Sequence, residues 1–112
     1  MIFVTGPAYA GKQEWLCGTF GWTEEEFRAR AVRDVQELAV EAGDLEALAD
    51  RLARKEAVIA SECGCGVVPA DPEARRRREA AGRLACLLAQ RAETVVRVCC
   101  GLPQVLKGEL KC

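Results

Sequence analysis

The sequence contains no histidine among its 112 residues, and this absence excludes more chemistry than any other. Histidine general bases, Ser–His and Cys–His nucleophile pairs, and metal sites with imidazole ligands are all ruled out. An excess of charge of either sign is also lacking, because 16 Lys and Arg stand against 17 Asp and Glu. No global field attracts nucleic acid or an anionic membrane, so we expect neither as a partner.

Long apolar runs are missing as well. No segment approaches the roughly 18 apolar residues that a membrane-spanning helix needs. The first residues, Met1 to Lys12, have no basic region ahead of a long apolar stretch, which a secretory signal requires. We therefore expect a protein without a membrane span, located in the cytoplasm. Its length suits one compact domain, residues 1–112, with a small core.

Cysteine is the exception among the scarce residue types, with seven in the chain. The odd number and the lack of a secretory signal argue against a disulfide framework. Cys63 and Cys65 lack the two-residue spacing of a zinc knuckle, and Cys99 and Cys100 are adjacent. Two alternatives remain: small buried or surface thiols, which we favour, and metal-binding or redox-sensing groups.

Short apolar, β-branched runs alternate with helical patterns along the chain. Predicted strands are Ile2–Thr5, Ala57–Ser61, Thr94–Cys99 and, after a turn at 101–103, Val105–Leu106. Predicted helices follow Gly11, Thr23, Asp44 and Asp71, the last one running to about Ala92 and burying Ala80, Ala81, Leu84, Leu87 and Leu88. Residues 31–35 fit either an edge strand or a continued helix. The alternation predicts an α/β fold: a parallel sheet with helices on both faces.

A glycine-bounded loop follows the first predicted strand and precedes a helix. It matches the phosphate-loop (P-loop) pattern G-x-x-x-x-G-K, in the strand–loop–helix context that such a loop requires. The glycines let backbone N–H groups face a phosphate, and the lysine reaches the β and γ phosphates. We therefore predict a purine-nucleotide site, for ATP or GTP, with a purely structural loop as the alternative. The predicted site comprises Gly6, Pro7, Ala8, Tyr9, Ala10, Gly11, Lys12 and Gln13.

Two further positions bear on the metal that usually accompanies such a loop. Gln13 stands where a Ser or Thr normally ligates Mg²⁺, and its amide oxygen is a longer, neutral substitute. Glu62 follows an apolar strand and lies where P-loop enzymes place an acid. We predict Lys12 and Glu62 as catalytic residues, and Gln13 and Glu62 as Mg²⁺ ligands. A solvated loop glutamate is the equally weighted alternative, and Asp34 is a weaker acidic candidate.

Four successive arginines, Arg75 to Arg78, point around the predicted helix and cannot form one patch. Arg75 can pair with Glu79, four residues further on. A solvated face is the favoured interpretation; an arginine that reaches a ligand phosphate or a neighbouring subunit is the alternative.

Beyond the loop, several residues resemble one family: Glu62, Gly64, Gly66 to Pro69, Ala74, Arg75, Arg78, Ala81 to Leu84, Ala89, Ala92, Gly101 to Pro103 and Lys107. With the P-loop, they make the chain similar to the cobinamide kinase / cobinamide-phosphate guanylyltransferase family over Met1 to about Phe20 and Ala57 to Lys107. The resemblance implies a P-loop α/β fold, cobalamin (vitamin B12) biosynthesis, and phosphorylation of the cobinamide hydroxyl by ATP or GTP. It also implies a corrinoid partner and homo-oligomers with sites near subunit borders.

The chain departs from that family in two respects. The family passes GMP through a histidine, which this sequence lacks, and residues 21–56 stand where the histidine and an acidic strand are expected. The family's P-loop serine is Gln13. The resemblance therefore predicts a kinase without the guanylyl-transfer step; the alternative is a non-catalytic nucleotide- or corrinoid-binding module that acts through a partner or an oligomer.

Overall fold

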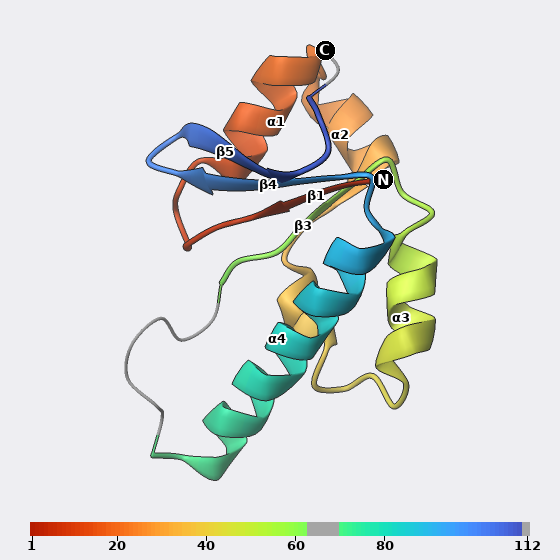
Figure 1. The fold of residues 1–112 in the computed structure, drawn as a ribbon, viewed down its shortest axis with the longest axis vertical. Helices are drawn as coiled ribbons and strands as arrows, with labels where there is room; N and C mark the ends of the chain where they lie inside the picture. Colours follow the sequence, from red (N-terminus) through yellow and green to blue (C-terminus); the bar gives the residue numbers. More distant parts are fainter. Residues whose placement is uncertain (63–69, 111–112) are drawn as a thin grey trace.

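A five-stranded sheet forms the centre of the molecule, with the strands in the order β2-β3-β1-β4-β5. The computed structural model describes residues 1–62 and 70–110. The strands are β1 (Ile2–Thr5), β2 (Ala31–Val32), β3 (Ala57–Ile59), β4 (Thr94–Cys99) and β5 (Leu102–Lys107). The first four are parallel and β5 is antiparallel to β4, so β1 lies in the middle of the sheet (Figure 1).

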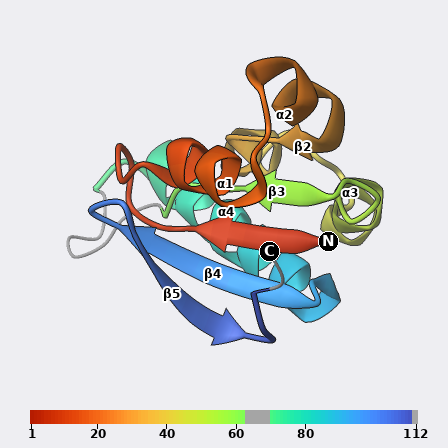
Figure 2. The ribbon, with the colours of Figure 1, turned by 90° about the horizontal axis from the view of Figure 1, so that it is seen from above.

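Helices cover both faces of this sheet, as Figures 1 and 2 show. One face carries α1 (Lys12–Phe20) and α2 (Glu24–Arg30). The other carries a 3₁₀ turn (Val35–Leu38), α3 (Leu45–Leu52) and α4 (Pro72–Arg91). Side chains of a strand alternate between the faces, which creates two cores.

The alternation is clear in β1 and β4. Phe3 and Val95 pack into the core under α3 and α4. Val4, Val96 and Val98 pack into the core under α1 and α2. Burial of both faces explains why these strands are almost continuously apolar. The polar Arg97 interrupts this pattern and alternates with Val96 and Val98, so it belongs to the α4 face.

The predicted parallel sheet with helices on both faces is confirmed. The predicted caps are also present: Thr23 Oγ1 accepts a hydrogen bond from the Glu26 amide at 3.2 Å, Asp44 Oδ1 from Ala47 at 3.2 Å, and Asp71 Oδ1 from Glu73 at 3.2 Å. The open question at residues 31–35 resolves into a two-residue edge strand, followed by Asp34 in the left-handed region.

Three details differ from the predictions. The strand predicted as Ala57–Ser61 ends at Ile59. The turn predicted at 101–103 lies at Cys100 and Gly101, whose φ angles of 54° and 73° suit a tight hairpin, so Leu102 and Pro103 belong to β5. Ala80 and Leu87 of α4 are only partly buried, whereas Ala81, Leu84 and Leu88 are buried as predicted.

Cysteines and arginines of the described residues lie mostly at the surface. Cys17 is half-buried, Cys86, Cys99 and Cys100 are exposed, and these four are free thiols; Cys63, Cys65 and Cys112 lie outside the described residues. Arg76 and Arg77 both form ion pairs with Glu73 on their own helix, and both are largely exposed. Arg75 donates to the Ala70 carbonyl at 3.2 Å. No helix in the described part of the chain is long and apolar enough to cross a membrane.

Candidate functional site

The loop between β1 and α1 is shaped by two glycines with positive φ. Gly6 has a φ of 146°, and a Cβ on it would lie 2.1 Å from the Val98 carbonyl oxygen. Gly11 has a φ of 83° and is the N-cap of α1. Glycine adopts a positive φ most easily, and at Gly6 the close approach of β4 also leaves no room for a side chain. The loop geometry therefore requires glycine at position 6 and favours it at position 11.

Backbone hydrogen bonds hold the loop at the carboxyl edge of the sheet. The Glu62 amide donates to the Gly6 carbonyl at 2.8 Å, and the Gly101 amide donates to the Ala10 carbonyl at 2.8 Å. The loop is thus anchored to the chain that follows β3 and to the β4–β5 turn. Ligands of open α/β sheets bind at this carboxyl edge, beside the central strand.

Helix α1 differs from the other α-helices in how it begins. Helices α2, α3 and α4 each start with a side chain that accepts a hydrogen bond from a first-turn amide. At the start of α1 the N-cap is Gly11, which makes no such bond. The first N–H groups of a helix carry partial positive charge and need acceptors. The amino end of α1 is consequently suited to accept an anion.

Lys12 is the first residue of α1 and is only 7% exposed. Its Nζ donates to the Pro7 carbonyl at 2.7 Å and lies 3.4 Å from the Gly6 carbonyl. The lysine therefore curls over its own loop. Burial lowers the pKa of Lys12 from its ordinary value, and the nearby carboxylates of Asp34, Glu62 and Glu14 partly oppose this effect. A bound phosphate would provide a negative counter-charge that stabilises this desolvated ammonium.

The loop borders a pocket of about 430 Å³. Six loop residues line it, from Ala8 to Gln13, together with Glu14, Arg33, Asp34, Gln36, Glu37, Ile59 and Ser61. Gln36 fixes one wall, because its Oε1 accepts a hydrogen bond from the Ser61 amide at 3.0 Å. Gly6 and Pro7 do not line this pocket; Tyr9 does, and its side chain is fully exposed.

Gln13 is engaged by an arginine that sequence reasoning did not single out. Arg33 Nη1 donates to Gln13 Oε1 at 2.7 Å, from the end of the edge strand β2. The sequence signal was weak, since Arg33 is one polar residue in a segment of undecided structure.

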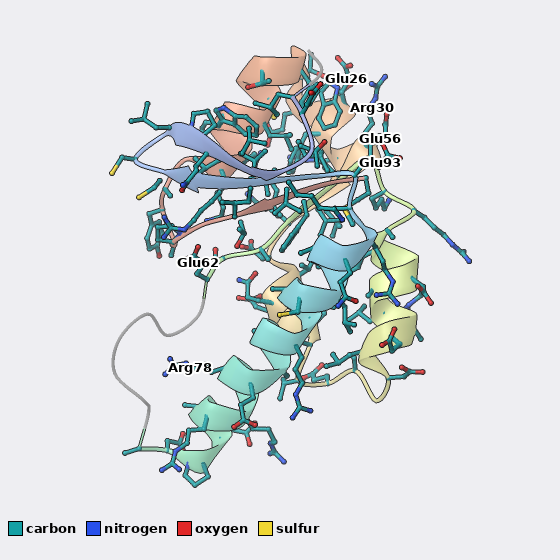
Figure 3. The ribbon with its side chains drawn as sticks, viewed as in Figure 1. Glu26, Arg30, Glu56, Glu62, Arg78 and Glu93 are labelled. Carbon is teal, nitrogen blue, oxygen red and sulfur yellow. The ribbon has the colours of Figure 1, made fainter. Side chains whose placement is uncertain are left out.

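Glu62 is engaged by a second arginine, on the α4 face of the sheet. Arg97 of β4 donates to both carboxylate oxygens, Nε to Oε1 at 2.6 Å and Nη2 to Oε2 at 3.1 Å. Glu62 lines a separate pocket of about 280 Å³ with Thr5 and the middle of α4; Figure 3 shows it where the chain leaves the sheet after β3. A signal for Arg97 did exist, because a charged residue interrupts an otherwise apolar strand.

The structure thus brings Lys12 and Gln13 into one pocket and places Glu62 in another. Each predicted Mg²⁺ ligand already accepts a hydrogen bond from a guanidinium. In their present positions the side chains of Gln13 and Glu62 do not fit a magnesium ion. Their assignment to Mg²⁺ stays a prediction, and it requires both arginines to move away. The glycine-rich segment 63–66 and Val67–Pro69 lie outside the described residues.

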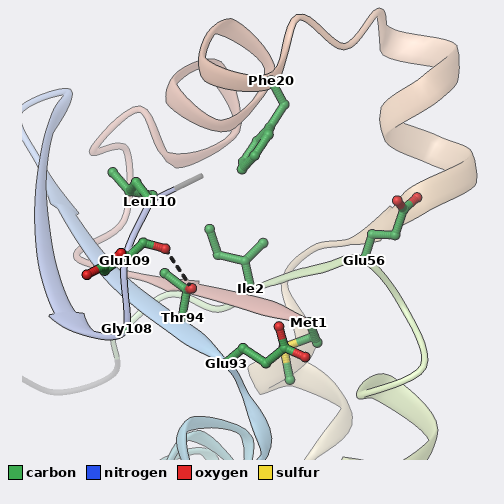
Figure 4. A pocket seen from close by; sticks show the side chains of 9 residues that line it. All are labelled: Met1, Ile2, Phe20, Glu56, Glu93, Thr94, Gly108, Glu109 and Leu110. Atoms are coloured by element: carbon green, nitrogen blue, oxygen red, sulfur yellow. Dashed lines mark hydrogen bonds between the residues drawn. The ribbon is translucent and has the colours of Figure 1, made fainter. Parts of the chain in front are cut away.

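A larger pocket, of about 540 Å³, opens at the opposite edge of the sheet (Figure 4). It lies at the amino ends of β1 and β4, and its lining includes Phe20 and Leu110. Three carboxylates also line it, those of Glu56, Glu93 and Glu109. Among the described residues that line it there is no lysine or arginine, whereas the P-loop pocket sets Lys12 and Arg33 against its own carboxylates. The P-loop pocket is therefore the better candidate for a nucleotide.

Comparison with known proteins identifies one family. The family model described as cobinamide kinase / cobinamide phosphate guanyltransferase matches residues 18–106, which is most of the chain. The matched range spans residues 21–56, where the sequence departs from the expected pattern. It begins after Gln13, so the interpretation of the P-loop rests on its own motif and geometry. No curated protein matches the chain.

Proposed function

Because the chain belongs to the cobinamide kinase / cobinamide phosphate guanyltransferase family, we propose that it binds ATP or GTP at Gly6–Gln13 and transfers the γ-phosphate to the hydroxyl of cobinamide. The family supports a role in cobalamin biosynthesis with nucleotide and corrinoid substrates. The observation that carries the nucleotide proposal is the uncapped amino end of α1 beside the buried Lys12. Together they offer oriented N–H groups and a cation to a chain of phosphates.

In this proposal the chain's own residues position the phosphates. The first-turn amides of α1 donate hydrogen bonds to phosphate oxygens. Lys12 exchanges the Pro7 carbonyl for the phosphates and neutralises the charge that develops on the leaving group. The glycines keep the loop open to the ligand. Glu62 is proposed to orient the acceptor hydroxyl. To do so, one of its carboxylate oxygens would have to give up its hydrogen bond from Arg97 and accept one from the hydroxyl. The proposed kinase works as a homo-oligomer whose sites lie near subunit borders.

A second candidate function is a nucleotide- or corrinoid-binding module without catalysis. A specific observation favours it: the side chains expected to serve catalysis through Mg²⁺, Gln13 and Glu62, are both bonded to arginines. Such a module would bind phosphates through the loop and act through a partner or an oligomer.

Titration calorimetry with ATP and GTP, each with and without Mg²⁺, tests the proposal when combined with transfer of labelled γ-phosphate to cobinamide. We expect binding of at least one nucleotide and label in cobinamide phosphate. Binding without any transfer would support the second candidate. No binding at millimolar nucleotide would reject the kinase and the nucleotide-binding module.

We also predict that no covalent GMP adduct forms on this protein. The guanylyl step needs a nitrogen nucleophile, and without histidine only lysines remain: Lys12, Lys55, Lys107 and Lys111. An ordinary lysine is neutral in only about one molecule in 10³ near pH 7. Lys12 is more easily deprotonated because burial lowers its pKa, but its Nζ is directed at the loop carbonyls.

Incubation with GTP and Mg²⁺, followed by intact-mass measurement at mild pH, checks this expectation. The mass should stay that of the unmodified chain. A stable gain of one GMP unit would contradict the prediction, and mass analysis of proteolytic peptides would then show which lysine carries it.

A further inference from the structure

An arginine lies beside the side chain that normally ligates a divalent cation in a P-loop nucleotide site. The Gln13 amide oxygen stands where a hydroxyl would ligate Mg²⁺, and Arg33 Nη1 lies 2.7 Å from it. A cation bonded to that oxygen excludes a second cation from the same place by repulsion. Glutamine stands where the motif has Ser or Thr, and the guanidinium that binds its oxygen lies beside the loop.

Arg33 is positioned to reach a ligand as well as Gln13. It lines the same pocket as the loop residues Ala8 to Gln13, and its side chain is 62% exposed. A guanidinium has five N–H donors in a planar fork, which suits two oxygens of a phosphate. One N–H donates to Gln13. The remaining donors can serve a phosphate oxygen in the pocket.

Carboxylates also line this pocket, and their negative charge opposes the binding of an anionic ligand. Glu14, Asp34 and Glu37 line it, and Asp34 Oδ2 lies 3.8 Å from Arg33 Nε. Across the residues that the structure describes, no three acids or thiols gather closely enough to hold a metal ion. Asp34 instead acts as a loose counter-charge to Arg33, and an incoming phosphate would compete with it.

We propose that Arg33, held by Gln13, is a phosphate-binding residue that takes the place of Mg²⁺, so that the loop binds a triphosphate without a divalent cation. This inference rests on the proposed nucleotide site and specifies its charge chemistry. The ligand it implies is any compound that carries a chain of phosphates, with the contacts made to the phosphates rather than to the base.

Inorganic tripolyphosphate is the probe, titrated by calorimetry into the full chain with EDTA and, separately, with Mg²⁺. We expect the wild-type protein to bind it in EDTA. Arg33→Gln should weaken binding in EDTA about tenfold, because a charge-assisted hydrogen bond is lost. Arg28→Gln is the matched control: Arg28 is also exposed, is paired with Glu24 at 3.1 Å on α2, and does not line the pocket.

Two further variants distinguish phosphate binding by the Arg33 guanidinium from phosphate binding through a metal ion. Gln13→Ser removes the acceptor that holds Arg33, so binding should weaken in EDTA and recover with Mg²⁺. Asp34→Asn keeps a residue that tolerates the left-handed backbone and removes a competing charge. Binding of tripolyphosphate to it should therefore tighten in EDTA, whereas loss of a metal ligand would weaken binding in Mg²⁺.

Wild-type binding that requires Mg²⁺, or equal affinities of Arg33→Gln and Arg28→Gln in EDTA, would overturn the inference. Either result leaves the proposed function standing if ATP or GTP still binds with Mg²⁺. Failure of ATP, GTP and tripolyphosphate to bind under both conditions would overturn the inference and the nucleotide site together.

Discussion

Replacement of Gly6 by alanine is expected to lower the free energy of unfolding by about 3 kcal/mol. The new Cβ would lie 2.1 Å from the Val98 carbonyl oxygen, and the φ of 146° is one that an L-residue rarely adopts. The clash involves two backbone segments of the central sheet, so neither can move without breaking β1–β4 pairing. Urea denaturation followed by circular dichroism measures the change.

Gly18→Ala is the control for this substitution. Gly18 lies within α1, and a Cβ there would meet nothing within 4 Å. Alanine in a helix is more stable than glycine by about 1 kcal/mol, so this variant should unfold at higher urea than the wild type. Equal unfolding midpoints for Gly6→Ala and the wild type would show that the loop does not have the conformation described.

The second large effect is expected from Lys12→Ala, which should weaken nucleotide binding about 100-fold. Lys12 is the buried cation of the loop, and the proposed site gives it two phosphates to neutralise. Alanine retains helix propensity at the start of α1, so the fold should persist. Calorimetry with ATP and GTP measures the affinity, and a thermal melt checks the fold.

Lys107→Ala is a matched control, because Lys107 also donates to two backbone carbonyls. Its Nζ lies 3.0 Å from the Ala89 oxygen and 3.2 Å from the Gln90 oxygen, away from the loop pocket. Its removal should leave nucleotide affinity unchanged. If the two variants bound nucleotide equally well, the phosphate role of Lys12 would be wrong.

Most helices and strands could be predicted from the sequence because their signals are local. Ile2–Thr5 is apolar and β-branched, and Asp71 followed by Pro72 marks a helix start; both signals are complete within a few residues. The β4–β5 turn lies at 100–101 rather than at the predicted 101–103, because Pro103 suggests a turn. On an edge strand, however, a proline costs little.

The candidate site was predictable only where a contiguous motif encodes it. Gly6, Gly11 and Lys12 fall within seven residues, and the structure gives each the conformation or burial that the motif requires. The partners of Gln13 and Glu62 lie 20 and 35 residues away along the chain. Their positions depend on strand order, which places β2 at one edge and β4 next to β1. No spacing rule connects such residues before the topology is known.

The anchoring of the loop by main-chain groups bears on how the protein tolerates substitution. Gly6 and Ala10 accept from the amides of Glu62 and Gly101, and an amide is present whatever side chain a residue carries. A substitution at position 13 or 62 therefore alters the chemistry of the pocket that its side chain lines without removing a main-chain hydrogen bond of the loop. The shape of the loop and the charges around it can accordingly change independently of each other.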